Sequence, residues 1–214
     1  MAAAADEPAV PVELTEDTRR QVADRLFSTK GRVEFGVSLG LMPFDALIVT
    51  PNLQLLLLGH LNDHVGLAVQ VGGGYGLTTG AVSQLGQAPY HGAPDDWRYL
   101  TSIIAGGEWA PIYAKAMVGG RVTHADLFLA KRFGATLQSS TLDGRLLVSP
   151  TFSPTVGTHV YVGDKTSVRA EFRYDLLIDA EPRALSVALG QNANVLVGVC
   201  VLTGKGKGKG SAPR

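Results

Sequence analysis

The stretch SVRAEFRYDL, residues 167–176, alternates strictly between two kinds of side chain. Every second residue from Val168 to Leu176 is apolar or aromatic, and every second residue from Ser167 to Asp175 is charged or carries a hydroxyl group. Successive side chains of a β-strand point to opposite faces, so a period of two predicts a strand with one apolar and one ionic face. The ionic face holds charges of both signs, which can pair with one another if that face is buried.

The same period of two recurs along the chain and predicts further strands. The expected strands are roughly 10–14 residues long, more than the ~5–6 usual in soluble sheets but enough for a tilted membrane crossing of ~9–11 residues. Their number is even, as the closure of an up-and-down bacterial barrel requires. The eight expected strands are Arg32–Leu41, Asn52–Leu61, His64–Leu77, Arg98–Trp109, Val122–Ala135, Thr151–Val162, Lys165–Ile178 and Gln191–Leu202.

The connections between these strands fall into short and long classes. Asn62-Asp63 and Gly163-Asp164 are tight hairpin signals, and both join an even strand to the next odd one. Ala110–Arg121 also belongs at this end but is long, so we expect a strand extension or an ordered turn there. Short turns on the periplasmic side and long loops outside are typical of outer-membrane barrels. The expected long loops, all joining an odd strand to an even one, are Pro43–Thr50, Thr78–Trp97, Thr136–Pro150 and Asp179–Gly190.

These patterns predict an all-β fold, an eight-stranded antiparallel up-and-down transmembrane β-barrel of the cell outer membrane, with a short N-terminal helical segment. Residues 1–30 form a periplasmic segment, in which Glu13–Phe27 has the pattern of an amphipathic helix. Residues 31–203 form the barrel, and residues 204–214 form a flexible Lys/Gly tail. Residues 1–8 lack the apolar core of a signal peptide. They fit either the remnant of a cleavage region or the tail of a cytoplasmic protein.

Composition excludes several classes of function. The 214 residues contain 19 Lys+Arg and 19 Asp+Glu, so nucleic acid is not an expected partner. Cys200 is the one cysteine, which excludes an intrachain disulfide and paired-cysteine metal or redox motifs. We therefore expect no catalytic residues, no cofactor and no metal. The histidines lack metal-binding spacing and are His60, His64, His91, His124 and His159.

The two faces of the strands predict two sets of residues. A barrel of about eight strands is only wide enough to be filled by side chains, so we expect a paired charge network in the lumen and no solute channel. The predicted network consists of Arg32, Glu34, Glu108, Asp126, Arg169, Glu171, Arg173 and Asp175. The predicted lipid-facing residues are Val33, Phe35, Val37, Leu39, Val65, Leu67, Val69, Val168, Phe172 and Tyr174.

Aromatic residues near the strand ends fit the lipid headgroup region, and core packing in a soluble barrel would explain them nearly as well. These residues are Trp97, Tyr99, Trp109 and Tyr113. A Lys on the lipid face at the bilayer midplane would cost about 2–4 kcal/mol, so we expect Lys131-Arg132 near the outer rim of the barrel. The long loop Thr78–Trp97 is the best candidate for contact with an external partner.

Several segments, in order, resemble a family of small outer-membrane β-barrel domain proteins best represented in myxobacteria. These segments are Arg25–Glu34, Leu58–His64, Gly107–Lys115, His124–Leu129 and Phe152–Gly157. The resemblance runs from roughly Gln21 to Leu202 and implies an integral outer-membrane protein of unassigned activity. Some members are linked by analogy to envelope or gliding-motility complexes. We therefore expect contact with outer-membrane lipid and with a periplasmic or envelope-complex protein.

Two other readings stay open at this stage. A soluble lipocalin-like barrel would turn the apolar face inward around a small hydrophobic ligand. A lipid hydrolase of the outer membrane would need a nucleophile bonded to a base that a carboxylate orients. His124 with Asp126, and Ser153 with His159 and Glu171, are the residues available for it, but no nucleophile motif surrounds them.

Overall fold

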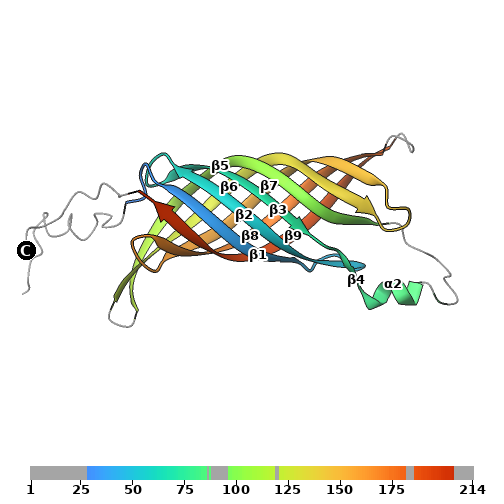
Figure 1. Ribbon diagram of the computed structural model, residues 1–214, viewed down its shortest axis with the longest axis horizontal. Helices are drawn as coiled ribbons and strands as arrows, with labels where there is room; N and C mark the ends of the chain where they lie inside the picture. Colours follow the sequence, from blue (N-terminus) through green and yellow to red (C-terminus); the bar gives the residue numbers. More distant parts are fainter. Residues whose placement is uncertain (1–27, 86, 88–95, 119–120, 182–185, 205–214) are drawn as a thin grey trace, which may run out of the picture.

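The computed structural model describes residues 28–85, 87, 96–118, 121–181 and 186–204. Eight long strands wrap into one elongated barrel with strongly tilted strands (Figure 1), and a two-residue strand, β4, pairs only with the start of β2. The elements are β1 (Val33–Met42), β2 (Ile48–His60), β3 (Val65–Gly74), β4 (Leu77–Thr78), α2 (Gly80–Leu85), β5 (Trp97–Val118), β6 (Arg121–Ser140), β7 (Leu146–Tyr161), β8 (Thr166–Glu181) and β9 (Ser186–Thr203).

Each long strand pairs antiparallel with the next long strand along the chain, so the topology is up-and-down. The barrel closes where β1 pairs with β9, from Val33 opposite Thr203 to Leu41 opposite Val195. Closure pairs strands that would otherwise be exposed edges. The predicted fold, an eight-stranded antiparallel barrel, is confirmed.

The strands reach further toward the long-loop end than the sequence predicted. The expected loop Thr136–Pro150 is mostly strand, because β6 continues to Ser140 and β7 begins at Leu146. In this region Gln138 and Ser140 point inward and are buried, while Ser139 on the other face is also polar. With polar residues on both faces, the contrast that marks a strand disappears although the backbone pairing continues.

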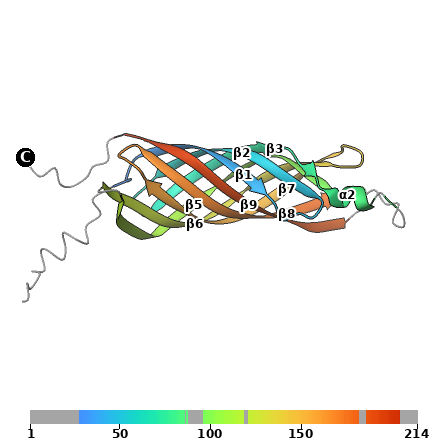
Figure 2. The same ribbon diagram turned by 90° about the horizontal axis from the view of Figure 1, so that it is seen from below.

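At the opposite end, β5 and β6 form a hairpin that extends past the other strands. Strand β5 continues to Val118, so the expected strand extension in Ala110–Arg121 is confirmed. A break in the β5–β6 register between Trp109 and Ile112 marks a bulge. Figures 1 and 2 both place this hairpin at the end of the barrel where β1 begins and β9 ends.

Helical structure is minor in the part of the chain that is described. The six-residue helix α2 lies at the long-loop end of the barrel (Figures 1 and 2). No helix among the described residues is long and apolar enough to cross a bilayer. The helix predicted for Glu13–Phe27 lies outside the described residues, and so does the tail predicted for 204–214 except for Gly204.

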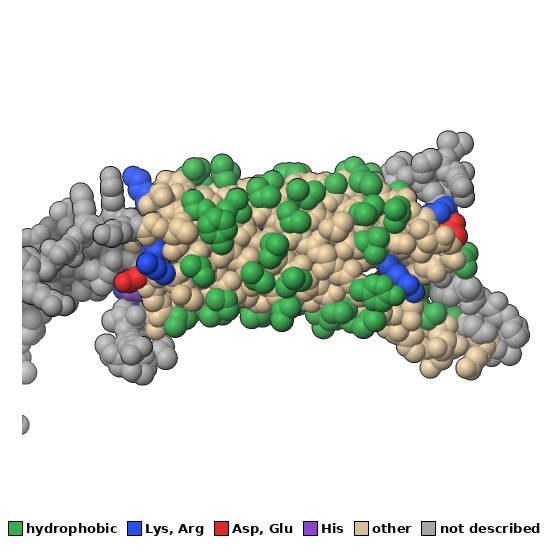
Figure 3. Space-filling model, in the orientation of Figure 1, with side chains coloured by type: hydrophobic (Ala, Val, Ile, Leu, Met, Phe, Trp, Pro, Cys, Tyr) green, Lys and Arg blue, Asp and Glu red, His purple; other side chains and the backbone are tan. Residues whose placement is uncertain are grey.

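Burial in this barrel is the reverse of that in a soluble protein. Along β1, Glu34 and Ser38 are buried at 0% and 3% exposure, whereas Phe35 and Leu39 are 53% and 72% exposed. Apolar side chains cover the wall in Figure 3, and charged ones gather at its two ends. Apolar surface is favourable against lipid and costly against water. The arrangement is that of a transmembrane β-barrel, and it rules out the lipocalin-like reading, which needs an apolar interior.

Candidate functional site: the ionic lumen

Three arginines occupy the centre of the lumen with their side chains fully buried. Arg132 lies on β6, and Arg169 and Arg173 lie on β8. The last two are four residues apart, so both side chains lie on the inward face of β8. Each is 0% exposed. Burying a charge is costly unless it is paired and hydrogen-bonded, so the partners of these guanidinium groups decide whether the interior is stable.

Arg169 lies between two carboxylates. Its Nη2 and Nη1 donate to the two oxygens of Glu108 at 2.6 and 3.1 Å, and its Nε donates to Glu171 Oε1 at 2.9 Å. Two parallel N–H···O bonds to one carboxylate are among the strongest polar contacts in proteins. The guanidinium carbon also lies 3.9 Å from the centre of the Phe128 ring, a cation–π contact.

Arg132 joins the same two carboxylates from β6, which is separated from β8 by β7 alone. Its Nη2 donates to Glu108 Oε2 at 3.2 Å, and its Nη1 donates to Glu171 Oε2 at 3.0 Å and to Gln70 Oε1 at 3.1 Å. Two arginines therefore share two glutamates, and the formal charges of the four side chains cancel. This neutral cluster connects strands β3, β5, β6 and β8 across the barrel.

Arg173 extends the polar interior toward the long-loop end. Its Nε donates to Asp175 Oδ2 at 3.1 Å, and its Nη1 lies 3.3 Å from Gln70 Oε1, the oxygen that Arg132 also uses. The Ser153 hydroxyl donates to Asp175 as well. These contacts link the Asp175 carboxylate, through Arg173 and Gln70, to Arg132 and so to the neutral cluster.

The remaining predicted lumen residues lie near the end with the short turns. His60 Nε2 lies 3.0 Å from Glu34 Oε2, and the Ser167 hydroxyl donates to Glu34 Oε1 at 3.1 Å. The Tyr161 hydroxyl donates to Asp126 Oδ2 at 3.0 Å. Arg32 donates to the backbone carbonyl of Asp164 in the β7–β8 turn.

Sequence reasoning missed Arg132 as a lumen residue, because Lys131-Arg132 was assigned to the outer rim. Both residues lie in the middle of β6, which continues five residues beyond the predicted end at Ala135. The signal was present, since Arg132 has the same parity as Asp126, which was predicted to point inward. The rim position predicted for Lys131 is also wrong: its side chain is exposed on the wall between Leu129 and Phe133.

The predicted wall residues lie on the outer surface. Val33, Phe35, Val37, Leu39, Leu67, Val69, Val168 and Phe172 are exposed, and Val65 and Tyr174 are half-buried.

The four aromatics predicted at the membrane interface differ in placement. Trp109 is 53% exposed on the wall, Trp97 is half-buried beneath the Arg145 guanidinium, and Tyr113 stacks on His124 in the β5–β6 extension. The interfacial assignment of Tyr99 is wrong, since its side chain is 3% exposed and its hydroxyl bonds with Ser102 at 2.8 Å. A register shift between Tyr99 and Thr101 adds one residue to β5 and turns Tyr99 inward.

The lumen leaves little free space near its short-turn end. A cavity of about 10 Å³ there is lined by His60, Asp63, Glu108, Asp126 and His159, among others. Such a volume holds about one water molecule, too little for a ligand. Within the described ranges, no group of three or more His, Cys, Asp or Glu side chains could hold a metal ion.

The residues considered for a hydrolase are not assembled into a catalytic group. Ser153 and His159 lie on one strand, six residues or about 20 Å apart. The Ser153 hydroxyl donates to Asp175, and His159 contacts Arg169. His124 pairs with the Tyr113 hydroxyl in the hairpin outside the barrel. Within the described chain, these contacts bond neither His124 nor His159 to a serine, so the predicted Ser–His pair is not formed.

A charged turn closes the β6–β7 connection at the long-loop end. The backbone amide of Arg145 donates to Asp143 at 3.1 Å, and the two side chains form an ion pair. The amide bond is the main reason that the pKa of Asp143 lies below its usual value. Asp143 is exposed and Arg145 is half-buried, so solvent screens the pair and it adds little to stability.

Two solved structures are similar to this barrel. A crystal structure of Neisserial surface protein A superposes with a TM-score of 0.52 and 14% sequence identity, over 79% of this chain and 95% of that protein. A crystal structure of Ail, the attachment invasion locus protein of Yersinia pestis, matches with a TM-score of 0.44 and 12% identity, over 81% of this chain and 99% of Ail. The first match supports the fold alone. No protein-family model matches the chain, and no curated protein matches it.

Proposed function

We propose that this chain is an integral outer-membrane protein with a structural, anchoring or interaction role in the cell envelope, and that its lumen is not a path for solutes. One observation carries this proposal: the barrel is apolar outside and filled inside by a neutral cluster of Arg132, Arg169, Glu108 and Glu171. The cluster connects strands across the axis. Its contribution is to hold the barrel together rather than to transport or transform a substrate.

The ordered motifs between Arg25 and Gly157 support membership of the small outer-membrane β-barrel family best represented in myxobacteria. The two ends of the barrel are the candidate contact regions for an envelope partner. At the long-loop end the β3–β5 connection is tied to the β1–β2 loop, because Thr79 donates through its backbone amide to Leu47 and through its hydroxyl to Ala46. That tie holds Thr79, at the start of the β3–β5 connection, beside the β1–β2 loop.

Membrane insertion tests the location. We expect the protein to need detergent or lipid to fold, and to stay with liposomes after alkaline extraction. Phe172→Arg should reduce insertion, because a charge on the lipid face costs up to about 2–4 kcal/mol, whereas Phe172→Leu should leave insertion unchanged. A folded monomer in plain buffer, or equal insertion of both variants, would contradict the proposal.

Permeation tests the closed lumen. Liposomes that contain the folded protein should release no more small sugar than empty liposomes. Arg169→Ala and Glu171→Ala together would remove much of the lumen filling, and any leak should appear only in that variant. Sugar release by the unmodified protein would show that the lumen is open.

Crosslinking tests the interaction role. A photoreactive residue at exposed Ser83 samples the long-loop end, and one at exposed Lys165 samples the periplasmic end. In intact envelopes we expect a defined protein adduct from at least one of these positions. Adducts from neither position would leave only the structural role.

A further inference from the structure

Two lysines lie at the short-turn end of the barrel, beside the seam where β1 pairs with β9. Lys30 comes shortly before the start of β1, and Lys165 lies in the β7–β8 turn. Both side chains are exposed. The Lys165 carbonyl accepts a hydrogen bond from the Leu202 amide at 2.7 Å, and Val33 pairs with Thr203. These contacts bring both lysines to the place where β9 ends.

Three more lysines follow β9 in the sequence. Gly204 comes directly after β9, and residues 204–210 alternate glycine with lysine, although only Gly204 of this run is among the described residues. Consecutive α-carbons are about 3.8 Å apart, so the run of lysines starts from the seam. We call this set the seam lysines: Lys30, Lys165, Lys205, Lys207 and Lys209.

The protein supplies few anions to the seam lysines. Within the described part of the chain, neither Lys30 nor Lys165 forms an ion pair through its ammonium group. Asp63 Oδ1 already accepts three hydrogen bonds from residues 28–30, and Asp164 is the exposed acid next to Lys165. Five lysines beside two aspartates leave this sector with a net positive charge, which favours an anionic partner.

The seam lysines lie where the apolar wall ends. Next to them on the outer surface are Val33 of β1, Val168 of β8 and Val201 of β9, with exposures of 36%, 38% and 50%. Figure 3 shows Lys and Arg side chains just beyond the apolar wall at the end where β1 begins. A lysine at such a boundary extends its ammonium group into the headgroup region, where lipid phosphates lie.

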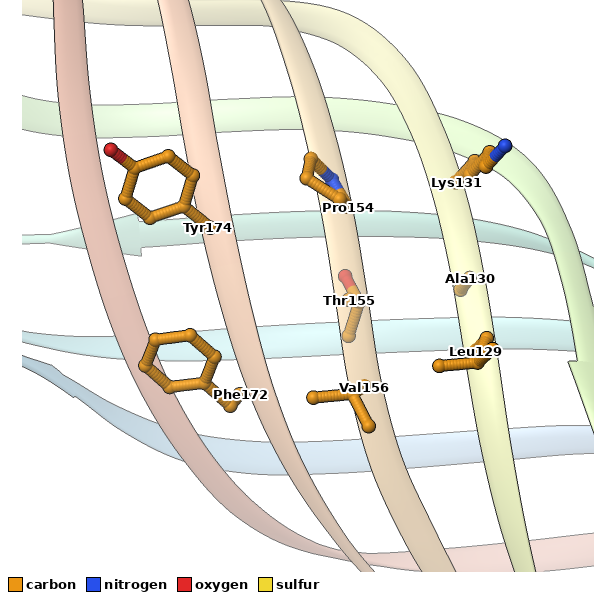
Figure 4. Close-up of a pocket in the computed structure, with 8 residues that line it drawn as sticks. All are labelled: Leu129, Ala130, Lys131, Pro154, Thr155, Val156, Phe172 and Tyr174. Atoms are coloured by element: carbon orange, nitrogen blue, oxygen red, sulfur yellow. The ribbon is translucent and has the colours of Figure 1, made fainter.

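Lys131 shows that the position along the wall decides whether a lysine can meet a headgroup. It lies on β6 beside Leu129, with Pro154 and Val156 of β7 next to it (Figure 4). The line of paired residues that leaves β1 at Val33 passes Lys131 after four strands, and after eight it returns to the far end of β1. Lys131 therefore lies about halfway between the two ends of the wall, too far from either headgroup region.

We propose that the seam lysines bind anionic phospholipids in the leaflet next to the short turns, with lipid phosphates at the ammonium groups and acyl chains against Val168 and Val201. The inference rests on the proposed membrane location. It goes beyond that location because it assigns one lipid class to one sector of one leaflet. Basic residues next to a membrane-spanning segment attract anionic lipids in this way. In the orientation typical of outer-membrane barrels, this is the periplasmic leaflet.

Quenching of a local tryptophan measures which lipid surrounds the seam. Val168→Trp, combined with Trp97→Phe and Trp109→Phe, gives a reporter chain with one tryptophan on the wall near Lys165. The reporter chain is folded into mixed vesicles of phosphatidylglycerol and phosphatidylcholine, in which one lipid or the other carries bromine atoms that quench fluorescence. At low salt we expect phosphatidylglycerol to be enriched at least about fivefold, the factor that one basic residue contributes near anionic lipid. In about 1 M salt the preference should fall, because the screening length shortens to ~3 Å.

Substitutions of the seam lysines test their part in this preference. Glutamine at Lys165, Lys205, Lys207 and Lys209 should remove most of the enrichment, whereas arginine at the same four positions should retain it. Lys131→Gln is the matched control, because it removes the same charge halfway along the wall and should leave the enrichment unchanged. Each variant is first checked for folding by its shift in gel mobility on heating.

Three results would overturn the proposal. These are equal quenching by the two lipids in the reporter chain, an enrichment that survives the four glutamines, and an equal loss in Lys131→Gln. If equal quenching is accompanied by binding to isolated peptidoglycan that the four glutamines abolish, the seam lysines bind that polymer instead of lipid. Failure of the reporter chain to enter vesicles would count against the membrane location, which is a different outcome from insertion without lipid preference.

Discussion

Removal of the Arg169 guanidinium should cost more stability than any exposed charge in the barrel. Arg169→Met keeps a long side chain but leaves Glu108 and Glu171, both buried, with Arg132 as the remaining cation of the cluster. Breaking a buried ion pair from one side typically costs about 3–5 kcal/mol, since the other charge stays buried without compensation. Arg169 contacts two carboxylates and Phe128, so we expect Arg169→Met to lower the free energy of unfolding by an amount in this range.

Urea unfolding in phospholipid vesicles measures this loss. Trp109 lies on the wall at 53% exposure and should report on the transfer from lipid to water through its fluorescence. Adding Glu171→Gln to Arg169→Met removes one excess negative charge. The double variant should therefore be less destabilised than the sum of the single variants, by about 0.5–3 kcal/mol.

Arg145→Met is the matched control, because Arg145 pairs with Asp143 at the surface with 30% of its side chain exposed. Arg145→Met should lower the free energy of unfolding by less than about 1 kcal/mol. If Arg169→Met costs no more than Arg145→Met, or if the double variant shows no coupling, the buried cluster does not stabilise the barrel.

Three further predictions follow from other parts of the barrel. Gly157→Ala places a Cβ 2.4 Å from the Phe128 ring and 2.5 Å from the Ala170 carbonyl, so it should lower the free energy of unfolding in vesicles by about 1–3 kcal/mol; no change would mean that the ring is not packed there. Tyr99→Phe removes a hydroxyl that bonds with Gln54 and Ser102, and should cost about 0.5–1.5 kcal/mol, whereas an external Tyr99 would lose nothing. Asp63→Ala removes the acceptor for the Ser28 hydroxyl and the Thr29 and Lys30 amides, so hydrogen exchange at both amides should accelerate while exchange in β2 is unchanged. Unaltered exchange at Thr29 would contradict the anchoring of this segment.

The face of each strand was predictable because alternation is a local property of the sequence. Residues of one parity in a strand share a face, so Glu34, Glu171 and Arg173 could be assigned to the interior without coordinates. The same rule fails where the register changes. Alternation in the sequence does not reveal the extra residue next to Tyr99. That residue places each β5 residue before it on the opposite face from the one that alternation predicts.

The pairing inside the lumen was not predictable from the sequence. The bidentate contact of Arg169 with Glu108 joins residues 61 positions apart and depends on the registers of four strands. Arg132 enters the same cluster only because β6 is long enough to bring it to the middle of the barrel. Sequence alternation supplies the list of inward charges, and the stagger between strands decides which of them meet.

The pairing of β1 with β9 also has a consequence for how the molecule is made. The first strand reaches its full set of neighbours only after the last eighteen residues of the sheet have joined it. A chain that stops before Ser186 would leave two open edges along the membrane, each with unsatisfied amides and carbonyls, which hydrocarbon does not tolerate. The barrel is therefore complete only when this seam pairs, and a partly built wall has no stable place in the bilayer.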